Sequence, residues 1–311
     1  PTIFFETYYL TRNTSDKSMY QGAYPIKDDI KFRLVQLRSG LRLPIYGSQL
    51  EVALTRQWYR AFIQEEIMTN EYGRLDAGAA YDYFRGWSLS GAWSIDMRKR
   101  TLDKTINPSS GYQLSVNLDL EKNNFIEGLN FSESGTLLEE FKSNDLGRIQ
   151  LGGSYHYELP WKKRWTISIK GHAGWISNND VDSFFHFYMG GMPGIKGYPF
   201  YSIQGTKSGL LDITMRVPIF MERHFKLNWL ILQNSTLGFI MQAGDAWTDQ
   251  MSIKKSIGIQ WRLNGFSFFN FPTAIEAEYH HPLNKFERII NEETIEYGDK
   301  GRTYLKVLFD F

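Results

Sequence analysis

The clearest pattern along the chain is an alternation of apolar and polar side chains with a period of two. From residue 112 to residue 120 every second position is Tyr, Leu or Val, and the positions between them are Gln, Ser, Asn and Asp. The same alternation returns at residues 149–159, 165–175, 256–263, 275–280 and 304–311. This period is typical of β-strands whose two faces meet different surroundings.

The alternation and the turn residues between the segments predict about twelve strands, an even number, as single-chain bacterial barrels have. The expected strands are residues 29–46, 48–64, 73–84, 87–102, 111–122, 146–159, 163–176, 207–217, 226–245, 253–263, 272–282 and 302–311. Residues 2–11 also alternate, and residues 226–245 are long enough to contain a hairpin at 233–236. Fourteen or sixteen strands therefore remain open. No helix and no second domain is expected.

The predicted fold class is all-β, a transmembrane antiparallel β-barrel. Most of the strands are long enough to cross a bilayer, for which a tilted strand needs about 9–11 residues. The longest uncharged run, residues 227–244, is too polar in its middle for a spanning helix, and lipid admits only helices and closed barrels. A soluble sandwich or lipocalin-like barrel also alternates, but so many long consecutive strands are unusual for it.

Link lengths predict the domain organisation and the orientation. Short links at residues 160–162, 218–225 and 264–271 alternate with long ones at 123–145, 177–206 and 283–301, and outer-membrane barrels carry their long loops outside the cell. Residues 29–311 are expected to form the barrel, and residues 1–28 an N-terminal segment that is an extra strand, a plug or a linker. The chain starts at Pro1, so we expect a removed leader or a fragment of a longer protein.

Charge and composition exclude several classes of function. The 35 Lys and Arg nearly balance the 34 Asp and Glu, so no basic footprint for a nucleic-acid partner is present. The sequence has no cysteine, which excludes disulfides and cysteine-ligated metals. No metal site and no cofactor is expected. Aromatic residues make up 16%, as the girdles at the two membrane interfaces require.

A glycine-rich run in the long link 177–206 is the most specific motif. Its characteristic residues are Gly190, Gly191, Gly194, Ile195, Lys196, Gly197 and Tyr198. Glycines allow close backbone approach and positive φ, which a loop in a crowded lumen needs. The run resembles the loop-six motif of the Omp85 (bacterial surface antigen) superfamily, in which an aromatic residue precedes a Gly-Gly pair and Val-Arg-Gly-Tyr/Phe follows.

The resemblance implies that this link, here called loop six, folds back into the barrel lumen. In that family the Arg of the motif pairs with an acid on the inner wall. The Arg is replaced here by Lys196, and Gln242 stands where the family has its Asp. Lysine keeps the charge but loses the bidentate fork. The resemblance therefore leaves Asp212, Gln242 or Asp245 as the lumen partner of Lys196.

Further stretches match the family in the expected order, so the resemblance covers residues 103–311. The turn with Pro108 and Gly111 resembles the family's Pro-Thr-x-Gly turn. Residues 211–218 and 238–247 resemble the two strands that follow loop six. Val307, Phe309 and Phe311 resemble the C-terminal β-signal of outer-membrane proteins.

The resemblance implies a protein of the bacterial outer membrane that acts in outer-membrane protein assembly or protein translocation. Outer-membrane lipids and client polypeptides at the seam between the first and last strands are the implied partners, and a homodimer is left open. The family's soluble POTRA modules have no counterpart in the sequence. The alternatives are a passive pore, a structural or oligomeric barrel without a client, and the C-terminal membrane anchor of a larger protein, such as one with a lipase-type passenger.

Enzymatic chemistry finds little support, and we expect no enzyme. Ser154 and His156 share the inward, polar face of one strand, whereas an outer-membrane phospholipase needs its Ser-His pair on the outer wall. His280 and His281 are adjacent on an expected strand, so they point to opposite faces and cannot easily chelate a metal together.

Overall fold

A computed structural model of the chain describes residues 1–15, 29–70, 73–99, 108–131, 137–162, 164–221, 225–268, 271–290 and 293–309. The long strands are β1 (Thr2–Ser15), β2 (Asp29–Ile45), β3 (Ser48–Asn70), β4 (Gly73–Asp96), β5 (Gly111–Phe131), β6 (Leu137–Glu158), β7 (Thr166–Ile176), β10 (Lys207–Phe220), β12 (Leu230–Trp247), β13 (Lys254–Ser267), β14 (Phe271–Pro282) and β17 (Arg302–Phe309). The short elements are the 3₁₀ turn η1 (Ser183–Phe185), β8 (Phe187–Tyr188), β9 (Gln204–Gly205), β11 (Phe225–Leu227), β15 (Phe286–Ile290) and β16 (Glu293–Tyr297). None of the helices in these ranges is long and apolar enough to cross a membrane.

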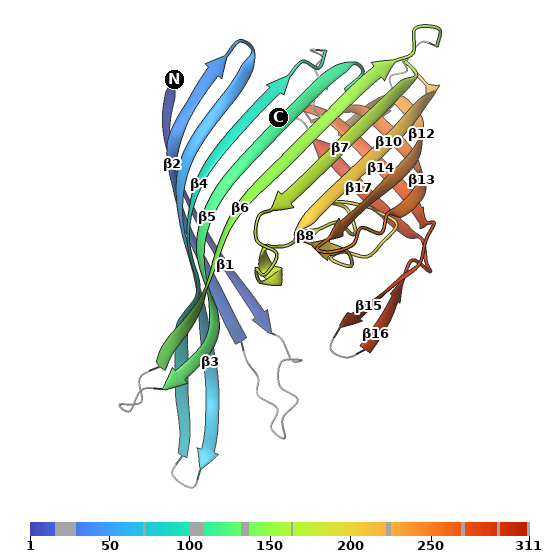
Figure 1. Cartoon of the computed structure of the whole chain (residues 1–311). Coiled ribbons are helices and arrows are strands. Elements are labelled where there is room, and N and C mark those ends of the chain that lie inside the picture. Colours follow the sequence, from blue (N-terminus) through green and yellow to red (C-terminus); the bar gives the residue numbers. More distant parts are fainter. Residues whose placement is uncertain are drawn as a thin grey trace. The chain divides into compact units, whose positions relative to one another are not determined.

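The long strands form one sheet in which neighbours in sequence pair with each other (Figure 1). Its order is β1-β2-β3-β4-β5-β6-β7-β10-β12-β13-β14-β17, and β11 pairs with the start of β12. β8 with β9 and β15 with β16 form separate two-stranded hairpins. Such a meander is the connectivity of an up-and-down barrel.

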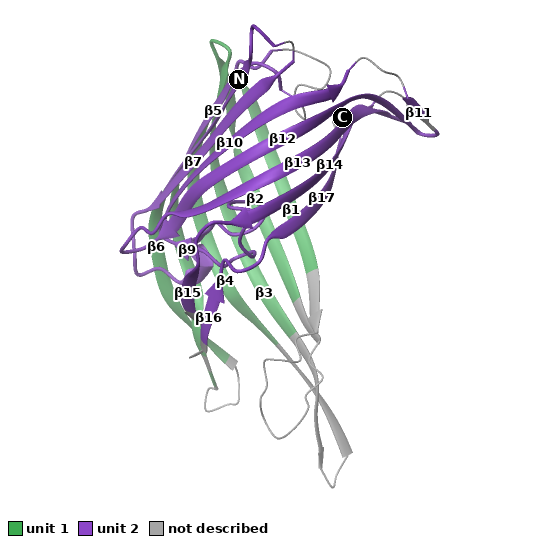
Figure 2. Cartoon of the chain, turned by 90° about the vertical axis from the view of Figure 1, so that its right-hand side faces the viewer, with its two compact units in different colours: residues 1–92, 118–148 green, residues 93–117, 149–311 purple. Residues whose placement is uncertain are grey.

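The chain divides into two compact units, which Figure 2 colours separately. The first comprises residues 1–92 and 118–148, and the second residues 93–117 and 149–311. The second unit contains loop six together with β7, β10, β12, β13, β14 and β17. The candidate site described below therefore lies within this unit.

The extra strand left open at residues 2–11 is present, whereas the predicted division at residues 85–86 was wrong. Residues 2–15 form β1, which was outside the predicted twelve, whereas 73–84 and 87–102 form the single strand β4 up to Asp96. Gly86, in the predicted break, continues the strand. A Cβ on Gly86 would lie 2.5 Å from Asn123 Oδ1, so this glycine marks a close approach to a neighbouring side chain rather than a turn.

The structure also corrects two predicted links. The expected long loop at 123–145 is mostly strand, because β5 continues to Phe131 and β6 begins at Leu137. The strands stay paired there although apolar and polar side chains do not alternate, because the hydrogen bonds between strands are made by the backbone. The hairpin expected at 233–236 lies earlier, between β11 and β12, where Asn228 takes a positive φ of 46°. The pairing of β12 with β13 instead shifts register between Leu232 and Asn234.

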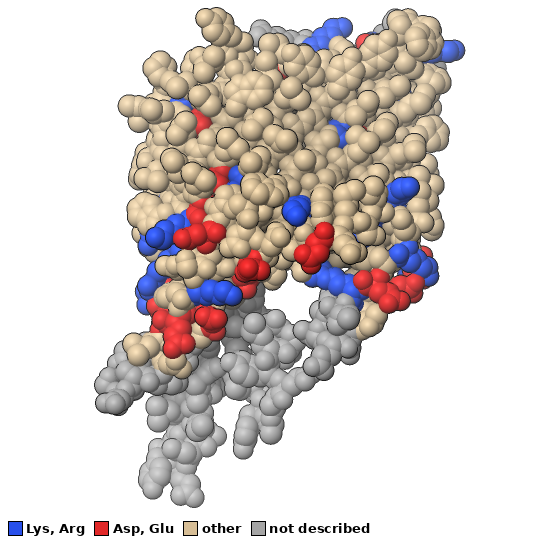
Figure 3. Space-filling view, viewed as in Figure 1, with Lys and Arg blue, Asp and Glu red and all other residues tan. Residues whose placement is uncertain are grey.

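The strands of the second unit have apolar side chains outside and polar side chains inside. On β12, Phe239 and Met241 are 50% and 62% exposed, whereas Gln242 is 4% exposed. On β13, Ile259 is 53% exposed and the adjacent Gln260 only 2%. This arrangement is the reverse of a soluble protein and suits an outer face in lipid around a polar interior. In the view of Figure 3, uncharged side chains make up most of the visible surface.

Candidate functional site

Loop six, residues 177–206, is folded by its own backbone hydrogen bonds. β8 and β9 pair at its base, and above them Met189 N donates to Ile203 O at 3.0 Å. Ile195 N then donates to Met189 O at 2.6 Å, and Gly191 N donates to Tyr198 O at 3.0 Å. These bonds close the glycine-rich run into a compact tip.

The glycines of the motif are required by this folding. A Cβ on Gly190 would lie 1.9 Å from Pro199 O, and one on Gly194 would lie 1.9 Å from Met189 O. Both distances are far below van der Waals contact, so any side chain at either position would force the backbone apart. Gly191 adopts a φ of +78°, a conformation that favours glycine.

The tip of loop six is bound to the inner wall by four hydrogen bonds around Lys196. Its backbone N–H donates to Gln242 Oε1 at 2.9 Å, and its carbonyl accepts from the Tyr304 hydroxyl at 2.9 Å. The ammonium donates to Glu278 Oε2 at 2.6 Å. Gln242 Nε2 also donates weakly to Gly194 O at 3.4 Å. The tip is thus held through both its backbone and its charge.

Tyr198 anchors the far side of the tip. It is fully buried, and its hydroxyl donates to Asn284 O at 2.8 Å. Burial raises the pKa of this phenol, which keeps it a hydrogen-bond donor. Gly197 lies so close to the wall that a Cβ would sit 2.7 Å from that of Ser256. The motif residues therefore pack as one surface against β12, β13 and β14.

Glu278 is the centre of the wall beneath the tip. Strand register places it opposite Gln260 on one side and Tyr304 on the other. Gln260 Nε2 donates to its Oε1 at 2.7 Å, and Lys306 Nζ donates to its Oε2 at 2.7 Å. Glu278 is only 2% exposed. Two ammonium groups and an amide offset the cost of burying this carboxylate.

A second buried acid extends the network toward the end of β17. Glu276 accepts from Arg262 Nη1 at 3.1 Å and from Lys306 Nζ at 2.9 Å. Lys306 therefore bridges Glu276 and Glu278. Loop six, β13, β14 and the terminal strand share one set of charge-assisted hydrogen bonds.

The three expected partners of Lys196 have different roles. Gln242 binds its backbone rather than its ammonium. Asp212 accepts from Gln242 Nε2 at 2.7 Å, so its hydrogen bond reaches the tip through that amide. Asp245 as a partner was wrong, because it accepts from Lys254 Nζ at 2.7 Å, at the end where β12 leads into β13.

Glu278, the actual partner of the ammonium, was missed. The alternation at residues 275–280 placed Glu276, Glu278 and His280 together on the polar face, so the sequence did mark an inward acid. The register across β12, β13 and β14 decides which inward acid lies under the tip, and the sequence pattern does not fix that register.

The remaining motif residues lie outside the loop-six site. Gly111 starts β5 with a φ of +98°, and a Cβ there would lie 2.3 Å from Met97 O. Pro108 precedes it in the same link. Val307 and Phe309 of β17 are 49% and 41% exposed and face outward. Phe311 lies outside the described residues.

His156 and His280 make polar contacts on the inward face of the wall. His156 Nε2 lies 3.2 Å from Ser154 Oγ, and its Nδ1 lies 2.8 Å from Ser168 Oγ. Both ring nitrogens thus meet hydroxyls, and no carboxylate of the described residues is hydrogen-bonded to the ring. His280 is buried and lies 3.2 Å from Glu278 Oε2, whereas the adjacent His281 is exposed.

Comparison with known proteins gives one family and one informative structural likeness. The model of the Omp85 superfamily domain matches residues 10–224. The crystal structure of BamA from Haemophilus ducreyi lacking POTRA domains 1-3 is similar with a TM-score of 0.57 and 12% identity over 98% of this chain. The chain spans 62% of the length of that structure. At this identity the likeness shows the fold alone.

Two other comparisons carry no argument. The β domain of the Bordetella autotransporter BrkA covers 89% of this chain at 10% identity, but its TM-score is only 0.27. No curated protein matches the sequence. The expected fold class, a transmembrane antiparallel β-barrel, is confirmed by the strand order of the sheet and by the similarity to the BamA structure.

Proposed function

The chain belongs to the Omp85 superfamily and is an outer-membrane β-barrel, and on that basis we propose that it handles unfolded polypeptides at the seam between its first strand, β1, and its last strand, β17. The protein would act in outer-membrane protein assembly or in protein translocation. Client chains would add to β17 as an extra strand, since main-chain hydrogen bonds to an open edge bind extended peptides with little sequence preference. The family expected from the sequence is confirmed, although its model matches residues 10–224 rather than the expected 103–311.

The observation that carries the proposal is the attachment of the loop-six tip to the terminal strand. Tyr304 of β17 donates to the carbonyl of Lys196, and Glu278 joins Lys196 to Lys306 of β17. Within the described residues, β17 pairs with β14 over the eight positions Arg302–Phe309. Loop six therefore adds hydrogen bonds to β17 beyond those that this short strand makes with β14.

The other edge of β17 supports the same proposal. β17 stands last in the sheet order, so among the described residues no strand is assigned to its outer edge. An unpaired edge is costly in lipid and is a template for another chain in any solvent. A client strand would satisfy those backbone groups. The side chains of Leu305 and Val307 point outward there, at 75% and 49% exposure.

A non-enzymatic role is part of the proposal. The contact between Ser154 and His156 lies on the inward face, and the second nitrogen of His156 meets the hydroxyl of Ser168 rather than an acid. A nucleophile-base pair needs its base oriented by a third group that stabilises the imidazolium. We assign these residues to polar packing of the lumen.

The test is photocrosslinking in cells from single positions that carry a photoreactive amino acid. Leu305 and Val307 are the test positions, and Ile259 on β13 is the matched control because its 53% exposure is close to that of Val307. The proposal predicts crosslinks from both positions on β17 to newly made outer-membrane or secreted chains, and none from Ile259.

Other patterns of crosslinks would contradict the proposal. Equal crosslinking from Ile259 would show general surface stickiness. Crosslinks only within the chain would favour a passive pore, a client-free structural barrel or a membrane anchor. Crosslinks only to a second copy would favour a dimeric barrel.

A further inference from the structure

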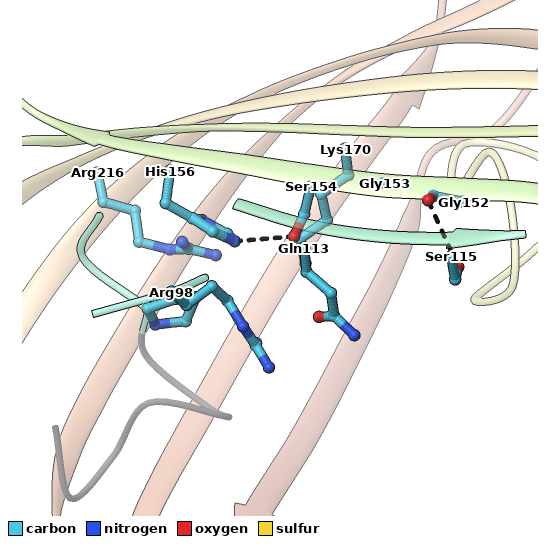
Figure 4. Close-up of a pocket in the computed structure, with 10 residues that line it drawn as sticks. Arg98, Gln113, Ser115, Gly152, Gly153, Ser154, His156, Lys170 and Arg216 are labelled. Atoms are coloured by element: carbon cyan, nitrogen blue, oxygen red, sulfur yellow. Dashed lines mark hydrogen bonds between the residues drawn. The ribbon is translucent and has the colours of Figure 1, made fainter. Parts of the chain in front are cut away.

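A cavity in the second unit, separate from the loop-six site, is lined by basic and hydroxyl side chains (Figure 4). Its volume is about 310 Å³, and it lies on the inward faces of β5, β6, β7 and β10 beside the segment that follows β4. Among the described residues, the charged side chains that line it are Arg98, Lys170 and Arg216, and none of the lining residues carries a carboxylate. The polar neutral residues include Gln113, Ser115, Ser154 and His156.

Two of the three cations have no ion-pair partner within the described part of the chain. Arg98 is held by both oxygens of Asp96, at 2.9 and 3.0 Å. Lys170 and Arg216 have no carboxylate within ion-pair distance among the described residues. Asp212, which stands opposite Lys170 in the register, accepts from Gln242 and Thr214 instead.

Arg216 points its free donor into this space. It is only 8% exposed. Its Nε donates to Gln260 Oε1 at 2.8 Å and its Nη1 to Ser168 Oγ at 3.4 Å, so none of the described residues accepts from Nη2. A buried guanidinium normally meets an anion, and its planar fork matches the oxygens of a phosphate or carboxylate.

The surroundings of the cavity favour an anion over a neutral ligand. Figure 4 shows Arg98, Gln113 and Arg216 reaching into the same space. A hollow lined by one sign of charge focuses its field and concentrates the opposite ion. A second cavity of about 370 Å³ shares Pro108 and Arg216 with the first and reaches Arg164 and Asn234 near the short links. The two cavities therefore lie on either side of Pro108 and Arg216.

We propose that this cavity binds a phosphate group, held by Lys170, Arg216 and Arg98 with the hydroxyls of Ser115 and Ser154. Its volume exceeds that of inorganic phosphate, so a small phosphate monoester also fits. A phosphorylated lipid headgroup would present the same chemistry. Gln260 joins Arg216 to Glu278 by hydrogen bonds of 2.8 and 2.7 Å, so Arg216 also contacts the loop-six network. Among the described residues no hydrogen bond or ion pair joins Lys170 to that network, so variants of Lys170 test the cavity separately from the function proposed for β17.

The test is isothermal titration calorimetry with the full chain refolded in a nonionic detergent. Inorganic phosphate and glucose 6-phosphate are titrated against sodium chloride of equal ionic strength. We expect saturable binding of the phosphates, and the variant Lys170→Gln should weaken it by about tenfold or more, because it removes a charge-assisted hydrogen bond. Lys170 has no ion pair to lose, so this change should not disturb folding.

The matched control is Lys226→Gln, which removes one charge from an exposed position on β11. It should leave phosphate binding unchanged. The variant Ser154→Asp, which brings a negative charge into the cavity, should abolish it. Folding of each variant is checked by its heat-modifiable migration on gels.

Nanodiscs containing phosphatidic acid distinguish the two sources of the phosphate group. Binding of this lipid, but not of soluble phosphate, that depends on Lys170 would assign the site to a headgroup. Absence of saturable binding in every arm would overturn the proposal. Equal loss of binding in Lys170→Gln and Lys226→Gln would also overturn it, since general charge attraction would then suffice.

Discussion

The ammonium of Lys196 at the tip of loop six lies 2.6 Å from Oε2 of Glu278 on β14, two strands away from the position of the family's acid. The site of that acid is occupied by Gln242, which binds the backbone N–H of the same lysine. The charge pair and the backbone contact of the tip are thus divided between two strands. This division explains how loop six docks although both members of the family's pair are replaced.

The variant Glu278→Gln should destabilise the protein more than any other single change in this network. It leaves the ammonium groups of Lys196 and Lys306 near a neutral side chain, and removal of one partner of a buried pair costs about 3–5 kcal/mol. The free energy of unfolding can be measured by urea titration in lipid vesicles, with tryptophan fluorescence as the signal. Glu296→Gln, in the exposed contact with Lys285, is the control and should change little. Equal effects of the two substitutions would refute the central role of Glu278.

Replacing Gln242 by the Asp that the family carries at this position should destabilise the loop-six site. Gln242→Asp removes the amide that donates to Asp212 at 2.7 Å and brings two carboxylates together. We expect a loss of about 1–3 kcal/mol, the cost of an unsatisfied buried group. The double variant Gln242→Asp with Asp212→Asn should recover most of it, because the amide then stands on the other residue. A double variant no better than the single one would show that the Gln242–Asp212 contact is not the cause.

The glycine at the turn of the motif should not tolerate a methyl group. Gly194→Ala places a Cβ 1.9 Å from Met189 O, so the tip should leave the wall and become sensitive to added protease. Gly209→Ala on β10 is the matched control, since its nearest neighbour is 3.9 Å away. The rate of cleavage within residues 177–206 is the measurement. Comparable rates in the two variants would contradict the packing described here.

Loop six should loosen in mild acid. Burial lowers the pKa of His186 below its ordinary value of 6.5, and the nearby Asp182 offsets part of this effect. The folded loop therefore keeps this histidine neutral, while an undocked loop takes up a proton more readily. Its contribution to stability is fully present above about pH 6.5 and is lost as the pH falls through the lowered pKa. Protease cleavage of the loop should rise between about pH 7.5 and pH 5, and His186→Gln should remove this dependence. A variant that retains it would locate the sensitivity elsewhere.

The sequence was sufficient for the fold class and for the strands with strict alternation. The pattern at residues 112–120 corresponds to β5, where Leu114 and Leu118 are 44% and 49% exposed as lipid-facing residues should be. Alternation failed where strands continue with polar side chains on both faces, as in β5 up to Phe131 and in β6 from Leu137. Polar side chains on both faces remove the periodic signal there, although the backbone ladder continues.

The candidate site could be predicted only in part for a related reason. The glycine motif and the inward position of Gln242 follow from sequence, because they depend on local spacing. The pairing of Lys196 with Glu278 depends on the register of three consecutive strand pairs, and a shift of one residue would turn Glu278 outward. Tyr304 and Lys306 were likewise visible as inward residues of the last strand, but their contact with loop six is a property of the assembled wall.

Hydrogen exchange of the backbone amides of β17 tests the central claim most directly, namely that loop six holds the terminal strand. The comparison is between the wild type and Lys196→Met, with Lys285→Met in an exposed ion pair as the control. If loop six holds β17, peptides covering residues 302–309 exchange about tenfold faster in Lys196→Met, because a tenfold change corresponds to a loss of roughly 1.4 kcal/mol of local stability. Exchange in the control is then unchanged. Unchanged exchange in Lys196→Met would show that β17 is held by β14 alone and would contradict the account.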